Sequence, residues 1–157
     1  MIGCSLGVLA YNEEANIVAL LTALLKQRLY ECEIVEIIVI ASGCTDRTVE
    51  LAQSVATQHS LVQVIIEDIR AGKAAAINHL IHIAQGDVIV LVGADTLPKH
   101  DAIEQLVRPF HDPKVGMTGA RVIPLNHPVN FIGFAVHLSA AGQLFICLLY
   151  TSDAADE

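Results

Sequence analysis

Residues 33–68 read EIVEIIVIASGCTDRTVELAQSVATQHSLVQVIIED and carry the clearest fold signal in the sequence. The stretch opens with an apolar run, EIVEIIVIA (33–41), and closes with another, LVQVIIED (61–68). Between them, TDRTVELAQSVATQ (45–58) has the pattern of a helix. Short β-branched runs on both sides of a helical segment predict a strand–helix–strand unit with parallel strands.

The same alternation extends outward from this unit in both directions. Toward the N-terminus lie a strand, CSLGVLA (4–10), and a helix in which apolar residues recur at helical spacing from Ile17 to Leu25. Toward the C-terminus the expected elements are helix 72–84, strand 87–94, helix 101–110 and strand 115–126. This order predicts an α/β fold, a three-layer α/β/α domain with a mostly parallel sheet.

Polar residues at the starts of three helices suggest how those helices are capped. Asn12 is expected to be the N-cap of the first helix, and Thr45 or Asp46 the cap of the second. Asp101 and Glu104 are spaced like a capping box at the start of helix 101–110.

Composition narrows the class of protein and its partners. The 157 residues suffice for one domain with a core, and 54% hydrophobic residues with 4% aromatics fit buried parallel strands. A formal charge of −8 argues against nucleic acid or an anionic membrane as the main partner. Four cysteines without a CxxC pair argue against a disulfide framework or a zinc site, so a cytoplasmic setting is expected.

Two segments near the C-terminus stand apart from this pattern. Residues 147–157, CLLYTSDAADE, resemble an in-frame translation of a sequencing-library transposon adapter, so we expect a non-native tail after Ile146 and a gene that continued further. The apolar segment 129–146 carries several polar residues and is short for a membrane helix. We expect it to be a helix that packs on the remainder of a longer protein.

In open parallel sheets, ligands bind beyond the carboxyl ends of the strands. The predicted loops at that edge are 11–14, 41–46, 68–73 and 93–98. Neither a GxGxxG after the first strand nor a GxxxxGK[ST] motif is present, which argues against dinucleotide-binding and P-loop proteins.

Four segments at these loops, taken in order, resemble the inverting family 2 glycosyltransferases of the GT-A fold. They are AYNEE (10–14), ASGCTDRT (41–48), RAGKAAAIN (70–78) and GADTLP (93–98). The resemblance covers residues 5–126 and implies that residues 1–146 form the donor-binding half of an incomplete GT-A domain. It also implies an enzyme that moves a sugar from a nucleotide-diphosphate donor to an acceptor hydroxyl on a glycan or lipid.

The resemblance implies roles for individual residues. The residues expected to bind the donor are Ala10, Tyr11, Asn12, Glu13, Ser42, Arg70, Lys73 and Ala94. Arg70 and Lys73 flank a glycine that opens a helix, and a helix N-terminus with two cations suits a diphosphate.

One loop departs from the family's usual pattern. ASGCTDRT stands where relatives carry a segment like Asp-Asp-Gly-Ser-Thr-Asp-Gly-Thr, so Ala41 and Ser42 replace two acids. In relatives that use uridine, the first of these acids reads the base, which the methyl group of Ala41 cannot do. This departure argues against a uracil-specific donor. Asp46 is expected to fix the loop and the helix start.

Asp95 is the candidate metal ligand. Gly93-Ala94-Asp95 stands where the family has Asp-x-Asp, whose last acid binds Mg²⁺ or Mn²⁺. These cations require only one or two carboxylates when phosphate oxygens complete the shell. The alternative is that Asp95 is only a turn residue.

Catalysis also requires a general base for the acceptor. The resemblance places this base beyond the fifth strand, so the catalytic residue is unknown and expected after Ile146, and residues 1–157 are not expected to transfer sugar alone. The sequence leaves open whether the full-length protein associates with the cytoplasmic face of a membrane.

Two other functions compete with this interpretation. A sugar-phosphate nucleotidyltransferase shares the sheet type but needs a Gly-rich loop with Arg near the N-terminus, which LGVLAYNEEA lacks. A non-catalytic nucleotide-binding or assembly module would keep the fold while losing Asp95 or Lys73, and both are present.

Overall fold

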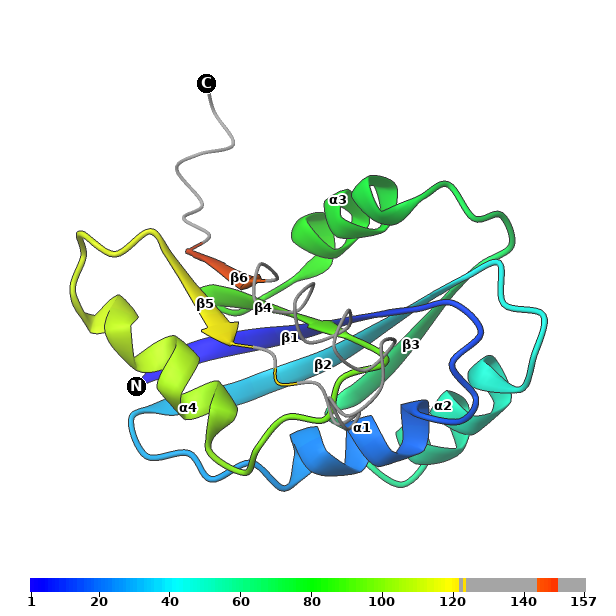
Figure 1. The fold of residues 1–157 in the computed structure, drawn as a ribbon, viewed down its shortest axis with the longest axis horizontal. Helices are drawn as coiled ribbons and strands as arrows, with labels where there is room; N and C mark the ends of the chain where they lie inside the picture. Colours follow the sequence, from blue (N-terminus) through cyan, green and yellow to red (C-terminus); the bar gives the residue numbers. More distant parts are fainter. Residues whose placement is uncertain (122, 124–143, 150–157) are drawn as a thin grey trace, which may run out of the picture.

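The computed structural model describes residues 1–121, 123 and 144–149. Within these residues a six-stranded sheet has the order β3-β2-β1-β4-β6-β5 (Figure 1). The strands are β1 (Ile2–Ala10), β2 (Cys32–Ser42), β3 (Val62–Glu67), β4 (Val88–Gly93), β5 (Met117–Arg121) and β6 (Leu144–Leu149). The helices are α1 (Ile17–Leu25), α2 (Thr48–Ala56), α3 (Lys73–Ile83), α4 (Ala102–Val107) and the 3-10 helix η1 (Arg108–His111).

The predicted parallel sheet is confirmed for the first four strands. β1 lies between β2 and β4 and is parallel to both, and β3 adds to the outer side of β2, again in parallel. β6 is antiparallel to its two neighbours, β4 and β5. The strand–helix–strand unit 33–68 therefore forms one side of the sheet as predicted.

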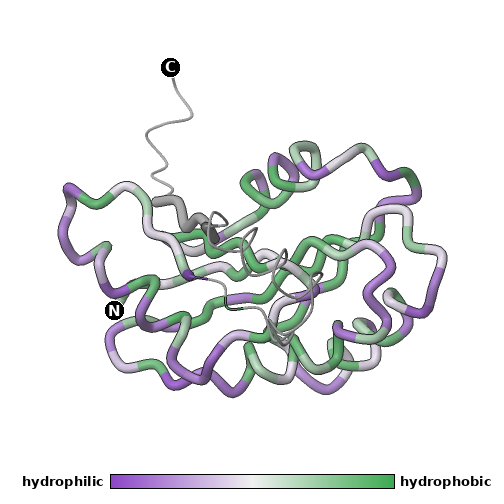
Figure 2. The backbone as a smooth tube through the Cα atoms, viewed as in Figure 1, coloured by the Kyte–Doolittle hydropathy of each residue, from purple (hydrophilic) through white to green (hydrophobic). Residues whose placement is uncertain are grey.

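Helices cover both faces of the sheet. α3 lies on one face, while α1, α2 and α4 lie on the other (Figure 1). The larger core lies on the face of α1, α2 and α4, and a smaller one joins Ala76 and Leu80 of α3 to Ile38, Ile40 and Ile89. Figure 2 shows the consequence, with hydrophobic residues concentrated along the central strands.

A glycine in β1 lets α3 approach the sheet closely. A Cβ on Gly7 would lie 2.1 Å from Cδ2 of Leu80, which is fully buried. Van der Waals contact requires more than 3 Å, so a larger residue at this position would force the Leu80 side chain to shift and would disturb the packing of α3 on the sheet.

Glu104 of α4 does not form the predicted capping box. Glu104 is 5% exposed, and its carboxylate accepts the backbone N–H of Tyr30 at 2.9 Å and of Glu31 at 3.2 Å. Asp101 makes no side-chain cap hydrogen bond. Glu104 instead fixes the chain that leads into β2, at the amino ends of the parallel strands.

The thiol of Cys32 completes this cluster. It lies 3.3 Å from Oε2 of Glu104, and burial, followed by the neighbouring Glu104, raises the pKa of the thiol to about 12. Desolvation works against the charge of Glu104, but hydrogen bonds from Tyr30, Cys32 and Glu31 lower the pKa of its carboxyl.

Three further expectations differ from the structure. Asn12 is not the N-cap of α1, because the helix begins at Ile17, after Asn16. The expected helix 129–146 is wrong for residues 144–146, which belong to strand β6; residues 129–143 lie outside the described residues. The expected strand 115–126 is shorter, Met117–Arg121, and residues 122 and 124–126 also lie outside them.

Within the described residues, the helices are all too short or too polar to cross a membrane. β6 spans the expected boundary between Ile146 and Cys147.

Candidate functional site

The carboxyl ends of four strands lie level with one another. Ala10 of β1 pairs with Ala41 of β2, and Ser42 of β2 pairs with Glu67 of β3. On the other side of β1, Leu9 pairs with Gly93 of β4. The loops that leave these strands therefore start along one edge of the sheet, as the sequence predicted.

Tyr11 and Arg70 bring the first and third of these loops into contact. Cζ of Arg70 lies 3.8 Å from the centroid of the Tyr11 ring. A guanidinium over an aromatic ring is attracted by the negative face of the ring. Tyr11 and Arg70 lie far apart in the sequence and were both predicted to bind the donor. The structure brings them into contact at the carboxyl edge of the sheet.

Asn12 ties the first loop to the second. Its backbone has φ of 53°, a left-handed conformation that Asn tolerates better than most residues. Its Oδ1 accepts the backbone N–H of Thr45 at 2.8 Å, and its Nδ2 donates to Oγ1 of Thr45 at 3.1 Å. The predicted donor-binding residue therefore has a structural role that its sequence position did not reveal.

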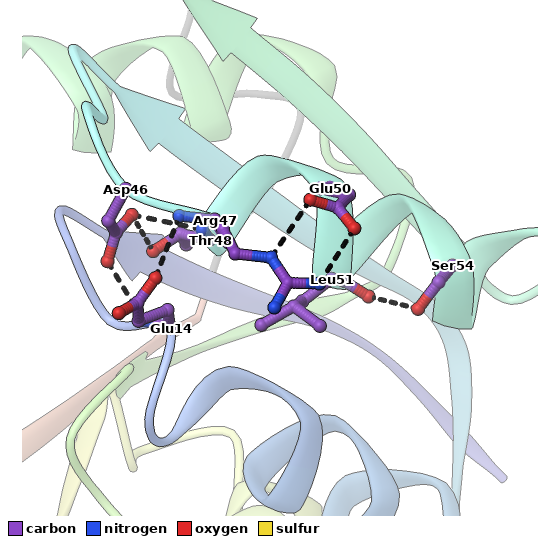
Figure 3. Close-up of polar contacts among 7 residues, drawn as sticks. All are labelled: Glu14, Asp46, Arg47, Thr48, Glu50, Leu51 and Ser54. Carbon is purple, nitrogen blue, oxygen red and sulfur yellow. Dashed lines mark hydrogen bonds and ion pairs between the residues drawn. The ribbon is translucent and has the colours of Figure 1, made fainter.

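Asp46 continues this connection between the loops (Figure 3). Its Oδ1 accepts the backbone N–H of Thr48 at 3.0 Å and the Thr48 hydroxyl at 2.6 Å, and its Oδ2 accepts the N–H of Glu14 at 3.1 Å. Desolvation opposes its charge, but these bonds from Thr48 and Glu14 lower the pKa of Asp46. Asp46 thus fixes the loop and the start of α2 as expected, but the N-cap position of α2, which begins at Thr48, is Arg47 and not Thr45 or Asp46.

Glu13 also contributes to the first loop. Its backbone N–H donates to Oγ1 of Thr48 at 2.7 Å, and its carboxylate accepts Nδ2 of Asn16 at 2.8 Å. The loop after β1 is thus held by the loop after β2 through several independent hydrogen bonds.

A second polar cluster joins the ends of β2 and β3 to α3, on the face of the sheet that α3 covers. The hydroxyl of Ser42 donates to Oε2 of Glu67, and Oε1 of Glu67 lies 2.9 Å from Nδ1 of His79 in α3. The hydrogen bond from His79, followed by that from Ser42, lowers the pKa of Glu67. Ser42 was predicted from the sequence, whereas Glu67 and His79 were not.

Gly43 places the loop after β2 against the segment that carries Arg70. Its N–H donates to the carbonyl oxygen of Glu67 at 2.7 Å, and its φ is 62°. A Cβ at this position would lie 3.1 Å from both the backbone N and the Cβ of Arg70. A side chain here would strain the backbone and crowd Arg70.

Lys73 is the first residue of α3 and follows Gly72, whose φ is 96°. Its side chain is exposed and makes no hydrogen bond or ion pair with any residue that the structure describes. The N–H groups at a helix start and a nearby cation attract anions. The start of α3 is therefore free to receive a phosphate group.

Asp95 follows β4 on a turn in which the N–H of Thr96 donates to the Gly93 carbonyl at 3.0 Å. Ala94 is buried, and the carboxylate of Asp95 is exposed. The Thr96 hydroxyl lies 3.5 Å from Oδ1, beyond a normal hydrogen bond.

The donor set around Asp95 suits a cation that shares its shell with a ligand. Among residues 1–121, 123 and 144–149, no three His, Cys, Asp or Glu side chains gather into a metal cluster. One accessible carboxylate fits Mg²⁺ or Mn²⁺ when phosphate oxygens supply other ligands, and it would not suffice for a cation held by protein alone.

The family model for glycosyl transferase family 2 matches residues 5–134. Poly-beta-1,6-N-acetyl-D-glucosamine synthase of Staphylococcus aureus is 36% identical over 107 residues, which cover 68% of this chain and 25% of that protein. Glycosyltransferase AglE of Haloferax volcanii is 30% identical over 112 residues, covering 71% of this chain and 36% of AglE. The chain thus spans about a quarter to a third of the length of these curated relatives.

A solved structure supports the same assignment. The mannosyltransferase PcManGT from Pyrobaculum calidifontis, in complex with GDP-Man and Mn²⁺, superposes with a TM-score of 0.69 and 26% identity. The match covers 93% of this chain and 44% of that chain. By its family model and its GT-A architecture, this chain belongs to glycosyl transferase family 2.

Proposed function

We propose that this chain is the donor-binding part of a glycosyltransferase that moves a sugar from a nucleoside-diphosphate donor to an acceptor hydroxyl. The observation that carries the proposal is the contact between Tyr11 and Arg70, with Asp95 on the adjacent strand end of the same sheet edge. An aromatic ring suits the nucleobase of such a donor, a cationic side chain suits its diphosphate, and a carboxylate suits the metal ion that accompanies it. The S. aureus and P. calidifontis relatives are named for reactions of this class.

Each part of the edge has a role in this proposal. Tyr11 offers a ring for a nucleobase, with Asn12 and Glu13 in the loop beside it, and Ala10 and Ala94 form the apolar floor at the strand ends. Arg70 and Lys73 face the diphosphate and stabilise the negative charge that builds up as it leaves the sugar. Ser42 lies further along the edge, next to Glu67.

Asp95 would hold Mg²⁺ or Mn²⁺, which would act as a Lewis acid on the departing diphosphate. The exposed carboxylate after β4 supports this role, as does the Mn²⁺ in the complex of the P. calidifontis mannosyltransferase. Asp95 itself fixes the position at which the diphosphate binds relative to Lys73 at the start of α3.

The acceptor and its activation complete the proposal. The acceptor is a hydroxyl of a glycan or lipid, and the general base that removes its proton lies beyond Ile146. The reducing cytoplasm, including the cytoplasmic face of a membrane, is the proposed compartment, since the four cysteines of the sequence include no CxxC pair and do not have the pattern of a disulfide framework.

The experiment is calorimetric titration of the 157-residue chain with GDP and UDP, in Mn²⁺ and in EDTA. We expect binding of at least one nucleotide that requires Mn²⁺. Asp95→Asn should weaken this binding about tenfold or more, because it removes a charged ligand of the cation. A tenfold loss of affinity corresponds to about 1.4 kcal/mol of binding free energy. Gly93→Asp, which restores the family's first acid, should not weaken it.

Asp101→Asn is the matched control, because it removes one carboxylate near α4, at the opposite edge of the sheet. Failure of both nucleotides to bind in Mn²⁺ would refute the proposal. Equal affinities for Asp95→Asn and the unmodified chain would reduce Asp95 to a turn residue. Rapid sugar transfer by residues 1–157 alone would contradict the placement of the base.

A further inference from the structure

We propose that Glu67 selects the nucleobase of the donor, and that the base it selects is guanine. This inference rests on the proposed function, because it names the donor that the same sheet edge would take.

Glu67 ends β3 at the same carboxyl edge at which Tyr11 follows β1, with β2 between the two strands. Ser42 and Glu67 pair across β2 and β3, and Ala10, which precedes Tyr11, pairs with Ala41, which precedes Ser42. Side chains alternate between the faces of a strand. Ile40 and Ile65, two residues before Ser42 and Glu67, pack with the core under α3, so Ser42 and Glu67 share that face.

Tyr11 reaches the same region through Arg70, in the segment that leads to α3. A base that stacks on Tyr11 would therefore extend its edge along the strand ends toward Ser42 and Glu67. Stacking on an aromatic ring holds a base without selecting it, so selection must come from groups at the base edge.

The carboxylate of Glu67 is oriented and has room for two more hydrogen bonds. Oε2 accepts the Ser42 hydroxyl, and Oε1 is 2.9 Å from Nδ1 of His79. Each carboxylate oxygen accepts about two hydrogen bonds, so one site remains on each. The side chain is 21% exposed, which leaves it within reach of a ligand.

The charge state suits an acceptor. The hydrogen bonds from His79 and Ser42 hold the pKa of Glu67 below its usual value, so the carboxylate is ionised at neutral pH. An ionised carboxylate accepts hydrogen bonds and donates none.

Guanine is the base whose edge matches this acceptor pair. It presents two adjacent donors, N1–H and the N2 amino group, and one carboxylate can accept both. Uracil presents a single N3–H between two carbonyl oxygens, which would face the carboxylate with like charge. Adenine and cytosine place an acceptor nitrogen beside their amino group. Ala41, at the position where uridine-using relatives carry their acid, offers no alternative acceptor.

The test measures affinities of the 157-residue chain for GDP, IDP and UDP in Mn²⁺. IDP is the sharp probe, because its base lacks only the N2 amino group of guanine. We expect GDP to bind about tenfold more tightly than IDP or UDP, the discrimination typical of a bidentate base contact. Glu67→Gln, which replaces one acceptor with a donor, should abolish the preference for GDP over IDP.

Asp68→Asn is the matched control, since it removes a neighbouring exposed carboxylate without touching the cluster. Thermal unfolding of each variant checks that the fold is intact. Ser42→Ala should reduce the preference only in part, because His79 still orients Glu67.

The outcomes separate this inference from the proposed function. If none of the three nucleotides binds, the proposed function fails and this inference fails with it. If nucleotides bind but GDP is not preferred to IDP, or Glu67→Gln weakens all three equally, only the inference is overturned. A preference for GDP that disappears in Glu67→Gln and persists in Asp68→Asn supports it.

Discussion

The two edges of the parallel sheet use carboxylates in opposite ways. At the amino edge, Glu104 and Glu36 are buried, and both are surrounded by donors: Glu104 accepts the N–H of Tyr30, while Glu36 accepts the Ser5 hydroxyl at 2.6 Å and the N–H of Gln85 at 2.7 Å. At the carboxyl edge, Asp95 is exposed, and its nearest donor in the described part of the chain lies 3.5 Å away.

This contrast distinguishes carboxylates with a structural role from carboxylates that are available to bind a ligand. A buried carboxylate must have its hydrogen bonds satisfied within the fold, because an unpaired one is costly. A carboxylate that binds a cation or substrate must keep its oxygens free until the ligand arrives. Glu67 lies between these extremes, since one acceptor site of each of its oxygens is used and the other remains.

The largest expected effect is at the amino edge. Glu104→Ala removes the acceptor of the Tyr30 and Glu31 N–H groups and should lower the free energy of unfolding by about 3 kcal/mol, because each N–H left without a partner costs roughly 1–3 kcal/mol. Urea unfolding of the variant measures this loss. Glu104→Gln, which keeps one acceptor oxygen, should recover part of it; an unchanged midpoint in Glu104→Ala would refute the structural role.

Lys73→Ala should have an intermediate effect, confined to the ligand. Its ammonium makes no contact that the described fold depends on, so stability should stay unchanged. Affinity for a nucleoside diphosphate in Mn²⁺ should fall about tenfold, the loss expected for one charged hydrogen bond to phosphate. Lys99→Ala is the control, because it removes an exposed lysine from the segment between β4 and α4. Equal losses of affinity in both variants would indicate only a general effect of charge.

The smallest effect is expected for Arg47, which forms an ion pair with Glu50 on the surface of α2 (Figure 3). Nη2 and Oε1 are 2.9 Å apart, but both side chains are 66% exposed, so water and salt screen the attraction. Arg47→Ala should change neither the melting temperature nor nucleotide affinity measurably. A clear loss of affinity would extend the functional edge along α2 and weaken the comparison.

Much of the fold was predictable because its signals are local. The alternation of apolar runs and helical spacings gave the order of strands and helices from Ile2 to Arg121, and the parallel sheet followed from that order. β6 was missed at Leu144–Ile146 because periodicity does not distinguish a short apolar strand from part of a buried helix.

The position of Tyr11, Arg70 and Asp95 at the carboxyl edge of the sheet was predictable, because each lies in a loop that follows a strand. Contacts between distant segments were not. Glu104 has the spacing of a capping box, yet its partners Tyr30 and Glu31 lie far away in the sequence. The Glu67–His79 pair likewise depends on the position of β3 in the sheet and on the rotation of α3 about its axis. No local sequence pattern predicts either of these.

The hydrogen bonds of Asn12 have a consequence for the thermodynamics of binding. By joining the loop after β1 to Thr45 in the loop after β2, they remove conformational entropy from both loops while the fold forms. A ligand that enters this edge meets loops that are already ordered, and less of its interaction energy is consumed in arranging them. The chain thus preorganises one side of the edge during folding, before any ligand is present.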